Sequence, residues 1–290
     1  MPFKLPSPSQ YRQVIRGFAT EWKSVYTPEK AREYLSQFKG GKVIMEKDEK
    51  LGIAKVLIAH EEKKNAFTGK MMVDLEKVVS ELEKWDTGRL AIIEGANENF
   101  CSGGDLDFVA KISTPEDGYM MNTFMGGTMR RLRRLPLVTI ANAQGICLGG
   151  AAELFLACDV RAVQYGAKIG FVQARLGIAP GWAGCSRIVE TLGRSKAIEV
   201  LATSTIFSAE EAKENGLASF LYKDTEEFEK YVTKYTKNSV NAVRACKQMV
   251  ENSGQVFTAE EKHKAERDIF IQVWGGPDNI EALNKNLKHN

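Results

Sequence analysis

Short apolar stretches alternate with longer helical patterns, and this alternation constrains the fold more than any other feature of the chain. Four short apolar stretches read as strands: residues 53–59, 90–94, 137–141 and 160–163. Three stretches between them have the spacing of helices: residues 71–84, 116–134 and 149–157. Strand, helix and strand in this order form a crossover unit, so the pattern predicts an α/β fold with a largely parallel sheet.

The chain divides into three parts. Residues 1–41 form an N-terminal arm that includes a short predicted helix at 28–38. Residues 42–225 carry the alternating pattern, with a further strand at 43–46. Strand signals fade after about residue 194, and the predicted elements are then helices, at 194–203, 208–215, 226–235, 239–252 and 258–272. We therefore expect residues 226–290 to be helical.

Composition excludes several classes of protein. The 290 residues are 43% hydrophobic, which is enough for a large core and too much for a disordered chain. A formal charge of +3 does not by itself predict a nucleic-acid or membrane partner. The apolar runs are shorter than the roughly 18 residues that a membrane-spanning helix needs.

Cysteine and histidine are too scattered to predict a metal site or another cofactor. The three histidines lie far apart, and the five cysteines are odd in number and never form a C-x-x-C pair: Cys101, Cys147, Cys158, Cys185 and Cys246. This pattern favours free thiols in the cytoplasm. The first 20 residues are basic and free of acids, so a mitochondrial address is the alternative, and whether the arm is cleaved stays open.

Three glycine-rich stretches attract attention: residues 99–106 (NFCSGGDL), 144–153 (QGICLGGAAE) and 176–184 (LGIAPGWAG). The first two lie between a predicted strand and a helix, where backbone N–H groups can point into a cavity and hold an anion. Each is weak alone, because Asp105 also fits a helix cap and Glu153 also fits a partner of the helix dipole.

Together, the order, spacing and flanks of these stretches resemble the crotonase (enoyl-CoA hydratase/isomerase) superfamily. Residues 64–67 (KNAF) and 157–161 (ACDVR) fit as well, and the resemblance covers roughly residues 42–287. It implies an acyl-CoA thioester substrate and a crotonase-type spiral of ββα units with a C-terminal helical domain. That domain would serve trimerisation or act as a lid, in a homotrimer or a dimer of trimers.

The resemblance also implies a site. Members of the superfamily hold a thioester enolate in an oxyanion hole of two backbone N–H groups, which correspond here to Gly104 and Gly150. The implied CoA site is lined by residues of two segments: Lys64, Ala66, Ser102, Asp105 and Leu106. Trp182 is expected either to wall the acyl pocket or simply to pack against a loop.

The second catalytic position separates possible reactions. Hydratases of the superfamily use two glutamates as general acid and base; Glu153 matches the first, but Gln173 occupies the second and its amide cannot exchange protons. Gln173 suits decarboxylation of a malonyl-type thioester, because a carboxylate there would repel the substrate's own by about 1–4 kcal/mol at 4 Å. We expect Glu153 to protonate the resulting enolate.

A closer resemblance favours the same reaction. Residues 266–282 (ERDIFIQVWGGPDNIEA), 114–118 (TPEDG) and 171–172 (FV) are similar to the animal branch that decarboxylates ethylmalonyl-CoA and methylmalonyl-CoA. That branch acts in cytosolic metabolite repair beside fatty acid synthesis. It carries histidine where this chain has Gln173, so the residue that protonates the enolate and the preferred malonyl homologue stay open.

Two alternatives remain. A hydratase or isomerase could use Glu153 alone, since isomerisation needs one base. An RNA-binding crotonase homologue could use the basic cluster at residues 130–134 (RRLRR), but four arginines give only local phosphate attraction. We expect this cluster to be a solvated helix face, or to contact CoA phosphates or a neighbouring subunit.

Overall fold

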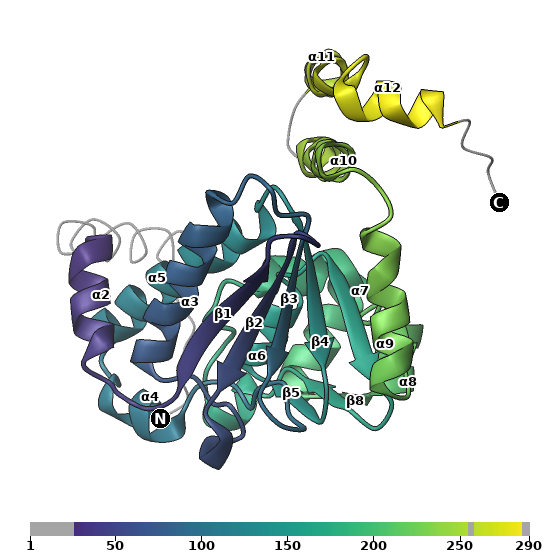
Figure 1. Cartoon of the computed structure of the whole chain (residues 1–290). Coiled ribbons are helices and arrows are strands. Elements are labelled where there is room, and N and C mark those ends of the chain that lie inside the picture. Colours follow the sequence, from purple (N-terminus) through teal and green to yellow (C-terminus); the bar gives the residue numbers. More distant parts are fainter. Residues whose placement is uncertain (1–25, 255–257, 286–290) are drawn as a thin grey trace.

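A six-stranded sheet forms the centre of the protein, as seen in the computed structural model, which describes residues 26–254 and 258–285 (Figure 1). Its strands, in spatial order, are β1 (Lys42–Asp48), β2 (Ile53–Ala59), β3 (Leu90–Gly95), β4 (Val138–Ala143), β6 (Val160–Gln164) and β9 (Phe220–Tyr222). Only β1 and β2 pair antiparallel; every other neighbouring pair in this sheet is parallel. The predicted α/β fold with a largely parallel sheet is therefore confirmed.

A second, smaller sheet lies beside the first. Its three short strands, in spatial order, are β5 (Ile146–Leu148), β7 (Lys168–Gly170) and β8 (Ile206–Ser208). Neither this sheet nor β9 was predicted, because each of these strands has only three residues and cannot show a two-residue period. The expectation that strands end near residue 194 was therefore wrong for β8 and β9.

The helices in the described part of the chain cover both faces of the large sheet and also extend beyond it. They are α2 (Pro28–Ser36), α3 (Gly69–Glu83), α4 (Leu106–Lys111), α5 (Pro115–Arg133), α6 (Gly150–Phe155), α7 (Cys185–Thr203), α8 (Ala209–Glu214), α9 (Thr225–Val232), α10 (Val240–Ser253), α11 (Ala259–Val273) and α12 (Pro277–Asn284). Short 3-10 turns occur at Glu61–Lys63, Gln173–Leu176 and Thr233–Tyr235. Helix α7 begins nine residues before its predicted start at 194, and Gly193 interrupts its helical geometry with φ 74°. Helix α12 was not predicted.

The large sheet is buried on both faces. Along β3, Ala91 and Ile93 belong to the main core with α3 and α5, whereas Leu90 and Ile92 belong to a second cluster that α9 covers. Consecutive side chains of a strand point to opposite faces, so this division follows from the two-residue period. Burial on both faces explains why the strands read as continuous apolar runs.

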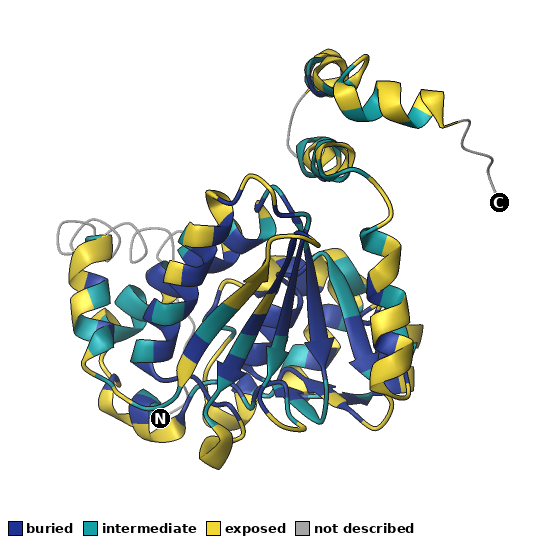
Figure 2. Cartoon of the chain, in the orientation of Figure 1, coloured by how far each residue is buried: buried dark blue, intermediate teal, exposed yellow. Residues whose placement is uncertain are grey.

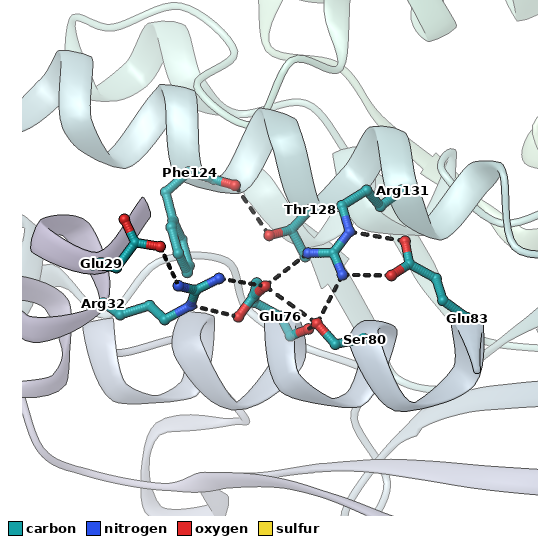
Figure 3. Close-up of polar contacts among 8 residues, drawn as sticks. All are labelled: Glu29, Arg32, Glu76, Ser80, Glu83, Phe124, Thr128 and Arg131. Carbon is teal, nitrogen blue, oxygen red and sulfur yellow. Dashed lines mark hydrogen bonds and ion pairs between the residues drawn. The ribbon is translucent and has the colours of Figure 1, made fainter. Parts of the chain in front are cut away.

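An ion-pair network joins α2, α3 and α5 (Figure 3). The buried carboxylate of Glu76 in α3 accepts hydrogen bonds from Arg32 Nε of α2 at 3.0 Å and from Arg131 Nη1 of α5 at 2.7 Å. These guanidinium groups lower the pKa of Glu76 to about 2. Helix α2 is thus fastened to the main body, and its Ala31 and Leu35 are fully buried in the main core.

Helices α11 and α12 lie away from the sheet at the upper right of Figure 1, whereas α10 still contacts β4. Helix α11 packs against α10, and many side chains here face solvent (Figure 2). Large apolar residues among them are Val250, Phe270, Ile271, Trp274, Ile280 and Leu283. Trp274 is 68% exposed and contacts the ring of Phe270. Within the described residues, no helix is both long and apolar enough to cross a membrane.

Candidate active site

An isolated β-bridge joins the first two glycine-rich stretches. Cys101 pairs with Cys147: the Cys101 N–H donates to Ile146 O at 3.0 Å, and the Leu148 N–H donates to Cys101 O at 3.1 Å. A side chain on Gly103 would place its Cβ 3.6 Å from the nitrogen of Gly150. The turn at 102–105 and the start of α6 are therefore direct neighbours.

The amides of Gly104 and Gly150 are both left without a backbone acceptor in the described part of the chain. Phe67 bonds to Gly103 O and to the Asp105 N–H, at 2.8 and 2.9 Å. In a parallel bridge the amide between those two groups points to the other side, so the Gly104 N–H faces away from Phe67. Gly150 is the first residue of α6, where an N–H has no acceptor within the helix.

The predicted CoA-binding residues lie on two adjoining turns. The Ser102 N–H donates to Lys64 O at 3.0 Å, which ties the two turns together. Asp105 caps α4 by accepting the Phe108 N–H at 2.8 Å, and Leu106 begins that helix, 62% exposed. Ala66 is buried. The cap confirms the structural interpretation of Asp105 offered by its sequence context.

Asn65 holds the first of these turns, a function that the sequence did not indicate. Lys64 and Asn65 both have left-handed backbone angles, with φ 51° and 61°. The Asn65 amide donates to Ala96 O and Asn99 O, each at 2.7 Å, and its Oδ1 accepts the His60 N–H at 3.0 Å. This buried side chain offsets the strain of the turn.

Cys101 is next to these turns but is shielded from solvent. It is fully buried, and burial raises the pKa of its thiol to about 12. Cys147 and Cys158 are buried as well, whereas Cys185 and Cys246 are exposed.

Glu153 lies at the centre of the candidate site, within α6. Its Oε1 accepts hydrogen bonds from Gln173 Nε2 at 2.9 Å and from the Gly181 N–H at 3.1 Å. Its Oε2 accepts the N–H groups of Trp182 and Gly184, at 2.9 and 2.7 Å. Only 1% of Glu153 is exposed. Burial raises the pKa of this carboxyl group, and the four donors oppose the shift.

Gln173 is oriented by its contact with Glu153. A carboxylate only accepts hydrogen bonds, so the amide must present Nε2 to Glu153 and Oε1 elsewhere. Gln173 is 5% exposed, and its Oε1 has no hydrogen-bond partner within the described residues. The structure therefore brings together the two residues that the sequence placed in the catalytic pair.

Residues 181–184 form a tight loop, which we call the Trp182 loop. Ala183 adopts a left-handed conformation with φ 59°. The Trp182 indole is buried over Gly150, where an added Cβ would lie 2.7 Å from Trp182 Cε2, and it meets the ring of Phe67 edge-on at 5.3 Å. Trp182 thus packs on the same glycine whose amide was predicted to bind the oxyanion.

Two of the four arginines in the basic cluster at 130–134 are paired with acidic side chains of this chain. Arg131 donates to Glu76 and Glu83, and Arg133 donates to Glu190 at 2.7 Å. Arg130 and Arg134 are exposed, as expected of a solvated helix face, whereas Arg131 and Arg133 are only partly exposed. This pairing removes charge that a nucleic acid would need.

The fold and this site define a class of proteins. Residues 48–279 match the enoyl-CoA hydratase/isomerase family, and the chain belongs to that family. The crystal structure of an enoyl-CoA hydratase from Bacillus anthracis superposes with a TM-score of 0.76 and 28% identity, and covers 85% of this chain and 95% of that one. An enoyl-CoA hydratase from Thermoplasma volcanium gives a TM-score of 0.77 at 26% identity, over 85% and 97% of the two chains. The predicted crotonase fold is confirmed.

Ethylmalonyl-CoA decarboxylases are more similar to this chain in sequence than these two hydratases are. The ethylmalonyl-CoA decarboxylase of Xenopus tropicalis is 41% identical over 265 residues, which is 90% of this chain and 88% of the relative. The ethylmalonyl-CoA decarboxylase of Rattus norvegicus is 38% identical over 90% and 89% of the two chains. The resemblance to the decarboxylase branch is thereby confirmed.

Proposed function

We propose that this protein is an acyl-CoA decarboxylase that converts ethylmalonyl-CoA to butyryl-CoA and CO2, with methylmalonyl-CoA as a second substrate. The observation that carries the proposal is the amide of Gln173, 2.9 Å from Glu153, in the place of a second catalytic glutamate. The similarity to ethylmalonyl-CoA decarboxylases over most of the chain supports it.

The reaction needs an acceptor for an electron pair. When the bond between the α-carbon and the carboxylate breaks, CO2 leaves and the two electrons flow into the thioester carbonyl, which becomes an enolate oxygen. The amides of Gly104 and Gly150 would bind that oxygen, and one such donor is worth about 3 kcal/mol in the transition state. Because the thioester is the electron sink, the reaction requires no metal or organic cofactor.

Gln173 would act through its lack of charge. A glutamate here would lie beside Glu153 and beside the substrate's carboxylate, and each additional negative charge would disfavour binding. The amide removes this repulsion. Its contact with Glu153 keeps it in one orientation during the reaction.

Glu153 is our proposed proton donor to the α-carbon of the enolate. Burial raises the pKa of its carboxyl group, which favours the protonated form that a general acid needs. A proton on Glu153 requires one of the four N–H donors to yield. The Gly181 N–H, at 3.1 Å, has the longest of these bonds and is the one we expect to open.

The CoA part of the substrate would lie along the turns at 64–66 and 102–106. The exposed side chains of Lys64 and Leu106 lie at the two ends of this proposed surface. Ala66, Ser102 and Asp105 would contribute mainly through their backbone groups, since the Asp105 carboxylate already caps α4.

In the decisive experiment, the purified protein is incubated with ethylmalonyl-CoA and, separately, with crotonyl-CoA. The thioesters are followed by chromatography with mass detection. Butyryl-CoA from the first, with crotonyl-CoA intact, supports the decarboxylase. Hydration of crotonyl-CoA with ethylmalonyl-CoA untouched overturns it in favour of a hydratase or isomerase that uses Glu153 alone. That second candidate is favoured by one observation, the buried carboxyl group of Glu153 with its raised pKa.

We further propose that the protein acts in the cytoplasm as a homotrimer or a dimer of trimers. The exposed apolar side chains of α11 and α12 support assembly, because a second copy would remove them from water. Light scattering of the purified protein should give three or six times the mass of 32.2 kDa, and a monomer would contradict assembly. Fractionation of cells from the source organism tests the location.

A further inference from the structure

Helix α2 lies outside the part of the chain that matches the family, yet it packs directly against α3 and α5. The family match begins at residue 48, and α2 ends at Ser36. The end of α2 touches the start of α3 so closely that a Cβ on Gly69 would lie 2.4 Å from Leu35 O. Glu76 joins α2 to α3 and α5 through Arg32 and Arg131 (Figure 3).

Tyr34 makes a second connection, from α2 to the first turn of α5. Its hydroxyl donates to Asp117 Oδ1 at 2.6 Å, and Asp117 Oδ2 accepts the Thr114 hydroxyl at 2.7 Å. Burial, together with the contact with Asp117, raises the pKa of Tyr34 to about 12. Asp117 is thus held from both sides, and it fixes how the N-terminal end of α5 lies against α2.

The next turns of α5 contact the Trp182 loop. Asn122 Nδ2 donates to Gly181 O at 2.8 Å. A Cβ on Gly181 would lie 3.5 Å from Met121 Cε, and a Cβ on Gly126 would lie 3.1 Å from the Cβ of Ala183. One side of α5 therefore supports the loop whose N–H groups bind Glu153 on the other side.

A continuous set of contacts thus runs from Tyr34 through Asp117 and Asn122 to Gly181, and from there to Glu153. We propose that Tyr34, acting through α5, positions the Trp182 loop and thereby determines how well the site distinguishes an ethyl from a methyl substituent on the malonyl group. The specificity part of this proposal rests on the proposed decarboxylase function. Tyr34 is a positioning residue, because its hydroxyl bonds to Asp117 and reaches Glu153 only indirectly, through α5 and the Trp182 loop.

The first test is independent of activity. It compares amide hydrogen exchange in wild type and Tyr34→Phe, read by mass spectrometry on the peptide that contains residues 181–184. Loss of the Asp117 contact should speed exchange of the Gly181, Trp182 and Gly184 amides by about five- to tenfold. Amides of β3 should exchange at the wild-type rate. Unchanged exchange in the loop overturns the proposal.

A matched control separates this effect from the loss of any tyrosine hydroxyl. Tyr235 bonds to the hydroxyl of Tyr231 at 3.0 Å, beside α9, which covers the second cluster. Tyr235→Phe should leave exchange in the Trp182 loop unchanged. Equal acceleration in both variants would show a general loss of stability and would contradict a specific connection from Tyr34.

Two neighbouring glycines of α5 give a second pair of variants. Gly126→Ala pushes a methyl group against Ala183, whereas a Cβ on Gly127 meets nothing within 4 Å. Both changes add the same helix propensity, so their difference isolates the displacement of the loop. We expect the first to alter exchange at 181–184 and the second to leave it unchanged.

The second measurement is the ratio of kcat/KM for ethylmalonyl-CoA to that for methylmalonyl-CoA. Tyr34→Phe and Gly126→Ala should move this ratio toward one by at least about threefold, while Tyr235→Phe and Gly127→Ala keep the wild-type ratio. Altered exchange with an unaltered ratio overturns the specificity assignment. If the wild type decarboxylates neither substrate, the proposed function fails, and the exchange measurement still decides whether Tyr34 positions the loop.

Discussion

Gln173 donates a hydrogen bond from its side-chain amide to the carboxylate of Glu153, 20 residues earlier in the chain, and both side chains are buried. Two carboxylates at this separation would share a proton or repel each other, as in paired acid sites. Here one partner is permanently neutral. The pair therefore carries a single negative charge at most, which is the condition that a substrate with its own carboxylate requires.

The charge of this pair can be changed directly. Gln173→Glu should lower kcat/KM for ethylmalonyl-CoA at least about tenfold, since the added carboxylate repels the substrate by ~1–4 kcal/mol. The rate of butyryl-CoA formation checks this. Gln173→Met, which has a similar size and no charge, should retain more activity than Gln173→Glu. Greater loss in the methionine variant would show that the hydrogen bond matters more than the charge.

Glu153→Gln tests the carboxylate itself. The new amide must turn an NH2 group toward N–H donors, and leaving a buried donor unpaired costs about 1–3 kcal/mol. We expect a lower thermal midpoint and at least about hundredfold slower turnover. Glu94→Gln serves as control, because the new side-chain oxygen can still accept the Asn142 amide, now 2.8 Å from Glu94. Turnover that stays at the wild-type rate would remove Glu153 from the mechanism.

Gly150→Ala should disturb the proposed oxyanion hole. Its Cβ would lie 2.7 Å from Trp182 Cε2, so the indole or α6 must move, at a cost of about 1–3 kcal/mol. Turnover should fall more than tenfold, as shown by initial rates with ethylmalonyl-CoA. Gly118→Ala in α5 is the comparison, because a Cβ there meets nothing within 4 Å. Similar rates in both variants would exclude a tight requirement at Gly150.

Acid should weaken the ion-pair network that joins the three helices. The pKa of Glu76 is lowered to about 2 in the folded protein, from an ordinary value of 4.5. Its contribution to the free energy of unfolding is therefore complete above pH 4.5 and is lost as the pH falls toward 2. Glu76→Gln should lose about 2 kcal/mol at pH 7, measured by urea unfolding, and less at pH 3.5.

A control for this network is Glu83→Gln. Glu83 also bonds to Arg131, but it is partly exposed, so the change should cost less than about 1 kcal/mol. A difference between Glu76→Gln and wild type that stays constant from pH 7 to pH 3.5 would contradict the lowered pKa of Glu76.

Periodicity in the sequence predicted the long elements of this fold well. Strand β2 was predicted with its observed bounds, and α3 within two residues, because each is long enough to show its period. The three-residue strands β5, β7 and β8 were not predicted, because their pairing depends on distant chain segments rather than on a local sequence pattern. The start of α7 at Cys185 was not predicted, because it directly follows Gly184, the end of a glycine-rich stretch that indicated only a loop.

The candidate site was partly predictable for a similar reason. The spacing of glycines and the family resemblance marked Gly104, Gly150 and Glu153, which the fold does bring near one another. No sequence rule could show that three amides of the Trp182 loop converge on one carboxylate, because the direction of an N–H depends on backbone angles such as the left-handed Ala183. The contact of Tyr34 with Asp117 joins residues 83 positions apart and could not be predicted from the sequence either.

The position of α2 also bears on how the chain is made. Its partners are synthesised later: Glu76 follows Arg32 by 44 residues, and Asp117 follows Tyr34 by 83. Ribosomes add ~5–20 residues per second, so the nascent helix waits roughly 4–17 seconds for α5. Nine residues do not hold a helix alone in water. The first described helix to leave the ribosome therefore cannot dock fully until α3 and α5 have been made, and nascent chains that stop before residue 115 lack the α5 partner of Tyr34.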